Sequence, residues 1–283
     1  MQSQRAFPPV YSCELFPPKT DEGMVKLKAA VESLRAIGPR FFSVTYGAGG
    51  STRERTFETV DWLRSVGIDT APHLSCIGST RAESRAIVQR YADAGIRRLV
   101  ALRGDLPSGV GLGELGELRH ANELVAFLRQ AFGDRFHIEV AAYPEVHPQA
   151  PNAAKDLEAF RRKVEAGANG AITQYFFNPD AYLRFVERCE QVGLAIPIVP
   201  GIMPITNYAQ LARFSDACGA EIPRWLRKRL EEFGDDRESI RAFGIDVVTA
   251  LCARLLAEGA PGLHFYTMNQ AGPTLAIWRN LGI

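Results

Sequence analysis

The feature that most constrains this chain is a repeated alternation of short apolar runs with longer amphipathic segments. Eight runs have the length and composition of β-strands, and each is followed by a segment with helical spacing. Eight β-then-α units with largely unbroken apolar strands predict one α/β domain over residues 1–283, a closed (β/α)8 (TIM) barrel. The expected strands cover residues 11–16, 41–46, 69–76, 97–104, 137–143, 170–176, 197–203 and 262–268.

The connections agree with this interpretation. Segment 21–38 carries one apolar helical face and ends at Gly38, while Asn178 and Pro179 have the order of an N-cap and a first helical residue. Ser51 and Glu54 have capping-box spacing, which predicts a helix from there to about residue 66. Residues 206–258 hold two or three helical segments, so extra helices are expected between strands seven and eight.

A doubly wound open sheet is the main alternative fold. Its dinucleotide fingerprint requires three glycines in the pattern G-x-G-x-x-G. The chain has Gly47 and Gly49 in "GAGGST", but Thr52 occupies the third position. The sequence therefore favours the closed barrel.

Composition excludes several classes of protein. The chain is 46% hydrophobic and 23% charged, without an apolar run of about 18 residues or the apolar core of a secretory signal. A net charge of +1 gives no reason to expect a nucleic acid or a membrane as partner. Five cysteines without a C-x-x-C pair are typical of reduced thiols, so we expect a cytoplasmic protein. We also expect a homo-oligomer, although the sequence does not fix its order.

Barrel enzymes carry their active sites at the C-terminal ends of the strands. Polar residues occur at or just after these ends throughout the chain, and their expected convergence is the strongest functional signal. They are Glu14, Thr45, Tyr46, His73, Arg103, Asp105, Tyr143, Glu145, His147, Gln174, Tyr175, Tyr266 and Asn269.

Each of these residues also has a purely structural interpretation. Glu14, in "YSCELFPPK", could cap loop backbone, and Asp105 could pair with Arg103 in "LRGDLP". The histidines do not have the spacing of a metal cage, so no metal is expected. The basic run from Arg161 to Lys163 could be a solvated helix face or a clamp for phosphates.

The missing groups narrow the chemistry further. None of the six lysines falls inside a predicted barrel strand, which argues against a Schiff-base aldolase, and the chain has no G-x-S-x-G nucleophile elbow. What remains is an acid (Glu14), a second carboxylate (Asp105), and amide and aromatic groups. That set suits a cofactor that carries the chemistry itself. A barrel lyase or aldolase, and a flavin or folate binder without turnover, remain the competing hypotheses.

Eight blocks of sequence, in order, resemble the methylenetetrahydrofolate reductase family. They are "CELFPPK", "VTYGAGGSTRERT", "PHLSCIG", "LRGDLP", "AAYPEVHP", "AGANGAITQYFF", "PGIMPITN" and "HFYTMN". The resemblance covers the bacterial-type catalytic barrel, from about residue 11 onward. It implies FAD bound without a Rossmann fingerprint, reduced by NADH or NADPH. The nicotinamide then leaves, and 5,10-methylenetetrahydrofolate takes its place and is reduced to 5-methyltetrahydrofolate in one-carbon and methionine metabolism.

The resemblance also assigns roles to individual residues. Glu14 matches the general acid that protonates N10 of the folate, and Asp105 matches an aspartate that stabilises the resulting cation and tunes the flavin. Gln174, Gln210 and Phe214 match residues that contact folate or stack on a bound ligand. The implied FAD contacts are Thr45, Tyr46, Ala48, His73, Arg103, Gly104, Asp105, Ala121, Tyr143, His147, Ala150, Asp156, Arg162 and Lys163.

Asp156, Arg162 and Lys163 are six and seven residues apart, so we expect them on roughly one helix face, lining one ligand tail. Two positions depart from the family pattern. His120 stands where a tyrosine is common, and Gln270 stands in "MNQ" where an arginine is common. A neutral amide at Gln270 would give a hydrogen bond to folate about half as strong as a charge-assisted one.

Overall fold

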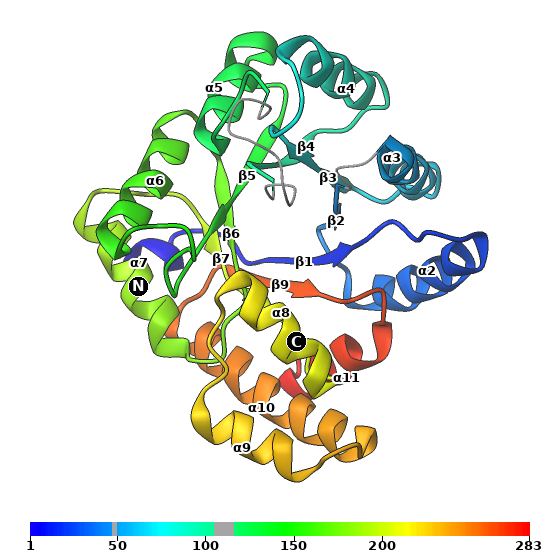
Figure 1. The fold of residues 1–283 in the computed structure, drawn as a ribbon, viewed down its shortest axis with the longest axis vertical. Coiled ribbons are helices and arrows are strands. Elements are labelled where there is room, and N and C mark those ends of the chain that lie inside the picture. The colour runs from blue at the N-terminus through cyan, green and yellow to red at the C-terminus, as the bar shows by residue number, and fades with distance from the viewer. Residues whose placement is uncertain (47–49, 105–115) are drawn as a thin grey trace.

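In the computed structural model, which describes residues 1–46, 50–104 and 116–283, the strands form one parallel sheet that curls into a barrel (Figure 1). The strands are β1 (Val10–Leu15), β2 (Phe41–Val44), β3 (Thr70–Ser75), β4 (Arg98–Leu102), β5 (His137–Ala142), β6 (Gly170–Thr173), β7 (Ile198–Val199), β8 (Gly201–Ile202) and β9 (Gly262–Tyr266). Their order is β7-β6-β5-β4-β3-β2-β1-β9-β8, and every pair is parallel.

The seventh predicted strand is split in two and closes the barrel. Pro200 has no amide hydrogen, so the ladder is interrupted between β7 and β8. The first part pairs with β6 and the second with β9, while the Pro200 carbonyl accepts the backbone N–H of His264 at 3.0 Å. Because β7 and β8 together make up the seventh predicted strand, the nine short strands correspond to the eight strands of the predicted (β/α)8 barrel. The open-sheet alternative is wrong.

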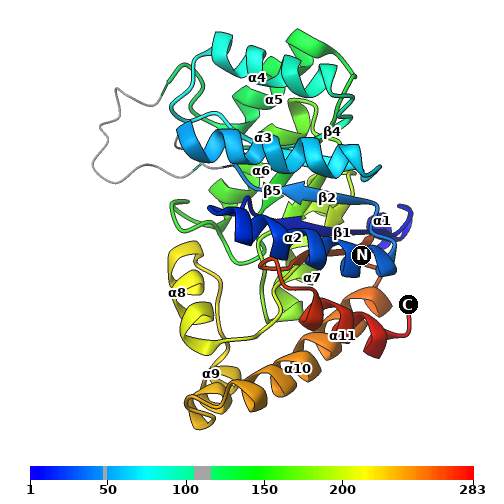
Figure 2. The ribbon, with the colours of Figure 1, turned by 90° about the vertical axis from the view of Figure 1, so that its right-hand side faces the viewer.

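Helices follow the strands and cover the outside of the barrel (Figures 1 and 2). They are α2 (Asp21–Leu34) with the short 3-10 turn η1 (Arg35–Ile37), α3 (Gly50–Ser65), α4 (Arg81–Asp93), α5 (Ala121–Phe132), α6 (Ala153–Glu165), α7 (Pro179–Gln191), α8 (Tyr208–Cys218), α9 (Arg224–Glu232), α10 (Arg237–Glu258) and α11 (Ala271–Leu281). The extra helices expected between strands seven and eight are α8, α9 and α10.

Several predicted helix ends are confirmed. Gly38 ends η1 with a left-handed φ of 59°, and the Asn178 side chain accepts the N–H of Asp180 at 3.0 Å, with Pro179 as the first residue of α7. The helix expected from Ser51 begins one residue earlier, at Gly50.

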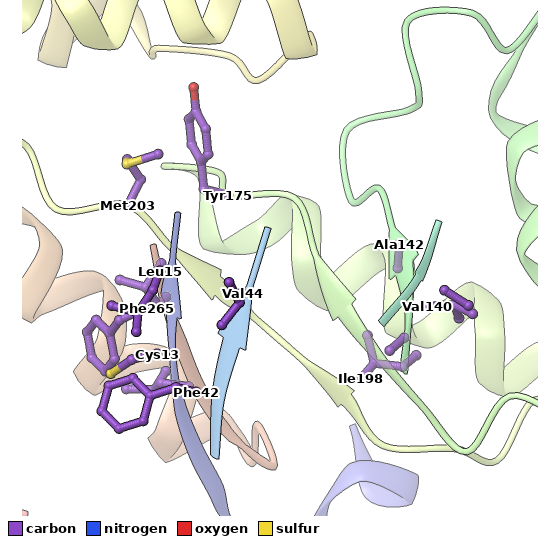
Figure 3. Packing of buried hydrophobic residues seen from close by; sticks show 14 of the residues in the cluster. Cys13, Leu15, Phe42, Val44, Val140, Ala142, Tyr175, Ile198, Met203 and Phe265 are labelled. Carbon is purple, nitrogen blue, oxygen red and sulfur yellow. The ribbon is translucent and has the colours of Figure 1, made fainter. Parts of the chain in front are cut away.

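Alternating residues of each strand separate two apolar cores. Cys13 and Leu15 of β1 point outward and pack with Phe42 and Phe265 in the large core between barrel and helices (Figure 3). A small second core fills the barrel interior and includes Phe41, Ala71, Val100 and Ile172. Because Ser12 and Glu14 alternate with Cys13 and Leu15, they face the interior.

The short helix α1 (Gln2–Arg5) was not predicted, and it ties the N-terminus to strand β7. The Gln4 side chain is fully buried: its Oε1 accepts the N–H of Ile198 at 2.8 Å, and its Nε2 donates to the Ile196 carbonyl at 3.1 Å. The side-chain amide of Gln4 thus provides hydrogen-bond partners for the Ile198 N–H and the Ile196 carbonyl, at and just before strand β7.

We expect Gln4→Ala to lower the free energy of unfolding by about 1–3 kcal/mol, because it leaves the buried N–H of Ile198 unpaired. Urea denaturation would measure the loss. Arg5→Ala is the matched control, since Arg5 makes an exposed hydrogen bond to the Ala257 carbonyl. Equal losses in both variants would contradict the assigned role of Gln4.

Candidate functional site

A cleft with two lobes opens at the C-terminal ends of the strands. The first lobe has a volume of about 720 Å³ and the second about 560 Å³. Both are within the range of small-molecule sites. Their walls share His73, Leu102, Arg103, Ala141, Tyr143, His147 and Gln149, so they are neighbouring parts of one cleft.

Most described residues predicted to contact FAD line the first lobe. These are Thr45, Tyr46, His73, Arg103, Gly104, Ala121, Tyr143, His147, Ala150, Asp156 and Lys163. His120, the departure from the family pattern, also lines this lobe. The structure brings these positions together from the ends of β2, β3, β4 and β5, the loop after β5, and helices α5 and α6.

Basic side chains surround the first lobe. Arg53, Arg103, Lys155 and Lys163 all contribute to its wall. The Nε of Arg53 is buried and has no hydrogen-bond partner among the described residues, and its guanidinium lies 5.7 Å from the centre of the Tyr46 ring. Sequence reasoning missed Arg53, because an arginine in the first turns of a helix is usually solvated. The lobe suits an anionic ligand.

Helix α6 places two lysines, Lys155 and Lys163, and one carboxylate, Asp156, at this lobe. Lys163 Nζ donates to the Ala141 carbonyl at 2.5 Å, and burial lowers the pKa of Lys163 to about 8, with Asp156 acting in the opposite direction. The Asp156 carboxylate accepts the backbone N–H of His147 at 2.9 Å. Arg162 does not line the lobe, since its guanidinium contacts Glu158 at 2.5 Å on the outer face of the helix. The expectation of one shared face is therefore wrong for Arg162.

Gly104, just after β4, lies in the wall of the first lobe next to the end of β3. Gly104 has a φ of +91°, and an added Cβ would lie 1.9 Å from Ser75 Oγ. That hydroxyl donates to the Arg103 carbonyl at 2.9 Å, so it is fixed in place. Only glycine fits this position, and Gly104 forms part of the wall of the first lobe.

The second lobe contains the predicted acid, Glu14, and two of the residues predicted to bind the substrate. Glu14, Gln174 and Phe214 line it, with Phe214 reaching over it from α8 and remaining 38% exposed. Tyr175 points toward α8, beyond the strand ends, and its hydroxyl lies 3.1 Å from Ser215 Oγ (Figure 3). Gln210, one turn before Phe214, does not line this lobe.

Glu14 faces two histidines inside the barrel. Its Oε2 lies 3.4 Å from His73 Nε2 and 3.9 Å from His264 Nε2. Burial lowers the pKa of His73; the neighbouring Glu14 opposes this shift and His264 adds to it. The Nδ1 of His264 lies 2.7 Å from Ser12 Oγ, which completes a buried polar chain of four side chains.

His264 was missed from the sequence. It lies inside "GLHFY", one of the apolar strands. Nothing in that pattern shows whether the histidine faces the barrel interior or the core between the barrel and the helices. Its register beside Ser12 of β1 could have indicated it only once the two strands were known to pair.

Some predicted positions lie outside these walls or outside the described residues. Asp105 and Ala48 belong to the part of the chain that the structure does not describe. Gln270 is exposed at the start of α11 and lines neither lobe.

Within the described residues, no group of three or more His, Cys, Asp or Glu side chains is arranged to hold a metal ion. No helix among them is long and apolar enough to cross a membrane.

Sequence comparisons show which known proteins the chain is similar to. The family model for methylenetetrahydrofolate reductase matches residues 2–282. The chain is 42% identical over 273 residues to 5,10-methylenetetrahydrofolate reductase of Escherichia coli strain K12, covering 96% of this chain and 90% of that protein. It is 38% identical to methylenetetrahydrofolate reductase (NADH) 1 of Arabidopsis thaliana, over 100% of this chain and 49% of that protein.

Solved structures support the fold alone. A Clostridium thermocellum protein described as binding two copies of 5-methyl-5,6,7,8-tetrahydrofolic acid aligns with a TM-score of 0.68 at 16% identity, covering 99% of this chain and 96% of the other. Dihydropteroate synthase of Xanthomonas albilineans aligns with a TM-score of 0.53 at 13% identity, over 97% and 93% of the two chains.

Proposed function

The chain belongs to the methylenetetrahydrofolate reductase family, and we propose that it reduces 5,10-methylenetetrahydrofolate to 5-methyltetrahydrofolate with NADH or NADPH as donor and FAD as cofactor. The observation that carries this proposal is the paired arrangement of the cleft. A lobe rich in cations adjoins a lobe in which a carboxylate, Glu14, faces the interior among buried histidines.

The first lobe fits FAD. Its basic side chains suit a diphosphate, and the buried Nε of Arg53, which has no partner among the described residues, offers a donor. Gly104, where a Cβ would meet Ser75, contributes backbone to the wall. Asp156 lies on the same face of α6 as Lys163 and offers an acceptor for a ribose hydroxyl. When bound, FAD would accept a hydride from the nicotinamide and deliver it to the one-carbon unit of the folate.

The second lobe is where the two substrates would bind in turn. Phe214 offers an exposed ring for stacking a flat heterocycle, and Gln174 offers an amide for hydrogen bonds. Glu14 would donate a proton to N10 of the folate, which opens the five-membered ring. Asp105 retains its predicted role of stabilising the resulting cation. Use of one lobe by both substrates predicts ping-pong kinetics.

We also propose the setting of this function. Residues 1–283 would form one catalytic domain that acts as a homo-oligomer in the cytoplasm, in the one-carbon metabolism that supplies methionine.

We expect the purified protein to bind FAD and to be yellow. Under anaerobic conditions NADH or NADPH should bleach the flavin absorbance, and 5,10-methylenetetrahydrofolate should restore it, with 5-methyltetrahydrofolate as product. Stopped-flow spectra with each nicotinamide would identify the preferred donor. A colourless protein that takes up no FAD would refute the proposal, and borohydride-trapped substrate would favour an aldolase. Flavin that is bleached but never reoxidised by the folate would favour a binding protein without turnover.

A further inference from the structure

The turn that follows strand β9 has an unusual backbone. Met268 and Asn269 have φ values of +51° and +55°, and the N–H of Gln270 donates to the Thr267 carbonyl at 2.8 Å. A turn with positive φ at both central residues is of type I′, whose central positions are dominated by glycine, asparagine and aspartate, so Met268 is the unusual residue there. Consecutive left-handed residues with side chains are unfavourable, so the surrounding contacts must hold this turn.

The Thr267 hydroxyl accepts the N–H of Asn269 at 3.2 Å within the turn, and three further side-chain hydrogen bonds reach the end of strand β1. The Thr267 hydroxyl donates to the Glu14 carbonyl at 2.7 Å. The Asn269 side chain makes two bonds to Phe16: its Oδ1 accepts the Phe16 N–H at 3.1 Å, and its Nδ2 donates to the Phe16 carbonyl at 2.8 Å. The last strand thus fixes the backbone on both sides of Leu15.

The neighbouring strand holds the same segment from the other side. The N–H of Thr45, just after β2, donates to the Leu15 carbonyl at 2.9 Å. The backbone of residues 14–16 is therefore anchored between β2 and the 267–270 turn, at and just past the last ladder pair of β1 with β9, Glu14 opposite Tyr266.

This anchoring matters because the Glu14 carboxylate itself is weakly held. Its contacts with His73 at 3.4 Å and His264 at 3.9 Å are at ion-pair range, and no hydrogen bond to it is made by any of the described residues. Three rotatable bonds separate the Glu14 carboxylate from the backbone. The position of the carboxylate therefore depends on where the backbone of Glu14 is fixed. Thr267 is only 3% exposed, so water does not readily substitute for its hydroxyl.

We propose that Thr267 and Asn269 are positioning residues that aim Glu14 at the substrate, and this inference rests on the proposed role of Glu14 as general acid. The left-handed turn is the feature that brings the Thr267 hydroxyl and the Asn269 amide onto β1 together. Neither side chain touches the substrate; each acts through the backbone of residues 14–16.

The test uses the full-length FAD-bound protein and single substitutions. Thr267→Val keeps the shape and removes the hydroxyl, Thr267→Ser keeps the hydroxyl, and Asn269→Gly allows the left-handed backbone but removes the amide. Thr70→Val is the matched control: Thr70 is also 3% exposed and its hydroxyl donates to the Ile68 carbonyl at 3.1 Å, at the start of β3 rather than at a strand end. Each variant is assayed for both half-reactions, for binding of 5-methyltetrahydrofolate, and for its melting temperature.

We expect Thr267→Val and Asn269→Gly to slow reoxidation by the folate by about tenfold to a hundredfold, as a misplaced acid would. Bleaching by the nicotinamide should change by less than about twofold and 5-methyltetrahydrofolate affinity should stay near wild type, because neither requires a proton from Glu14. Thr267→Ser should restore the rate, and Thr70→Val should lose only thermal stability.

Two results would overturn the inference while leaving the proposed function intact: folate reoxidation at the wild-type rate in both Thr267→Val and Asn269→Gly, or equal slowing of the two half-reactions in those variants. Wild-type protein that never transfers a hydride to the folate would instead overturn the proposed function, and this inference with it.

Discussion

Glu14→Gln should leave bleaching of the flavin by NADH or NADPH nearly unchanged and slow reoxidation by 5,10-methylenetetrahydrofolate by about a hundredfold or more, the effect of losing a general acid. The reason is chemical. Glu14 lines the second lobe, where both substrates would bind in turn, but only ring opening of the folate needs a proton from it. Glutamine keeps the size of the side chain and removes the proton that N10 requires. Single-turnover absorbance traces of the two half-reactions measure both rates.

Glu145→Gln is the matched control for this prediction. Glu145 also lies at the C-terminal rim, and its carboxylate accepts the N–H of Glu221 at 2.8 Å, but it lines neither lobe. Burial raises the pKa of Glu145, so a perturbed carboxyl alone does not identify the acid. A comparable loss in folate reoxidation in Glu145→Gln would count against the assignment of Glu14.

The barrel could be predicted because its signal is periodic. Alternating residues of β1 sort into Cys13 and Leu15 outside and Ser12 and Glu14 inside, as the sequence pattern requires. Pro200 could have indicated the split of the seventh strand, since proline leaves a gap in any ladder. Helix α1 carries no apolar periodicity, and its place depends on the single buried amide of Gln4, so no local pattern could reveal it.

The site residues at the ends of the strands could be predicted from the sequence. Residues whose place depends on strand pairing or on the angular position around a helix could not. His264 lies within an apolar strand, and only pairing with β1 brings it to Ser12 and Glu14. On α6, an advance of about 100° per residue puts Lys163 about 20° from Asp156 but Arg162 about 120° away. The basic run therefore contains one residue that faces the lobe and one that pairs with Glu158 outside.

Lys163→Met should weaken FAD binding by about tenfold to a hundredfold, the value of a lost charge-assisted hydrogen bond in a partly buried site. Methionine keeps the length of the side chain and its apolar packing. Arg162→Met is the matched control on the same helix, and we expect less than about 1 kcal/mol of change there, as for an exposed ion pair. Titration of flavin fluorescence into the apo-protein measures both affinities. If Arg162→Met had the larger effect, the position of Lys163 at the phosphates would be wrong.

The depressed pKa of Lys163 adds a pH dependence whose sign can be worked out. With a pKa of about 8 in the folded protein, Lys163 is charged below pH 8 and neutral above it, so wild-type FAD affinity should fall as pH rises from 7 to 9.

The same lysine affects the stability of the apo-protein. The folded protein binds fewer protons than the unfolded chain between about pH 8 and 10.5, so burial of Lys163 makes the free energy of unfolding rise with pH across that window. Lys163→Met should remove both trends. Its apo-protein should also melt higher than wild type at pH 7, because the buried ammonium, which is unfavourable without a bound phosphate, is gone. Melting curves and FAD titrations at pH 7 and 9 separate these effects, and a pH dependence of affinity that persists in Lys163→Met would assign it to another group.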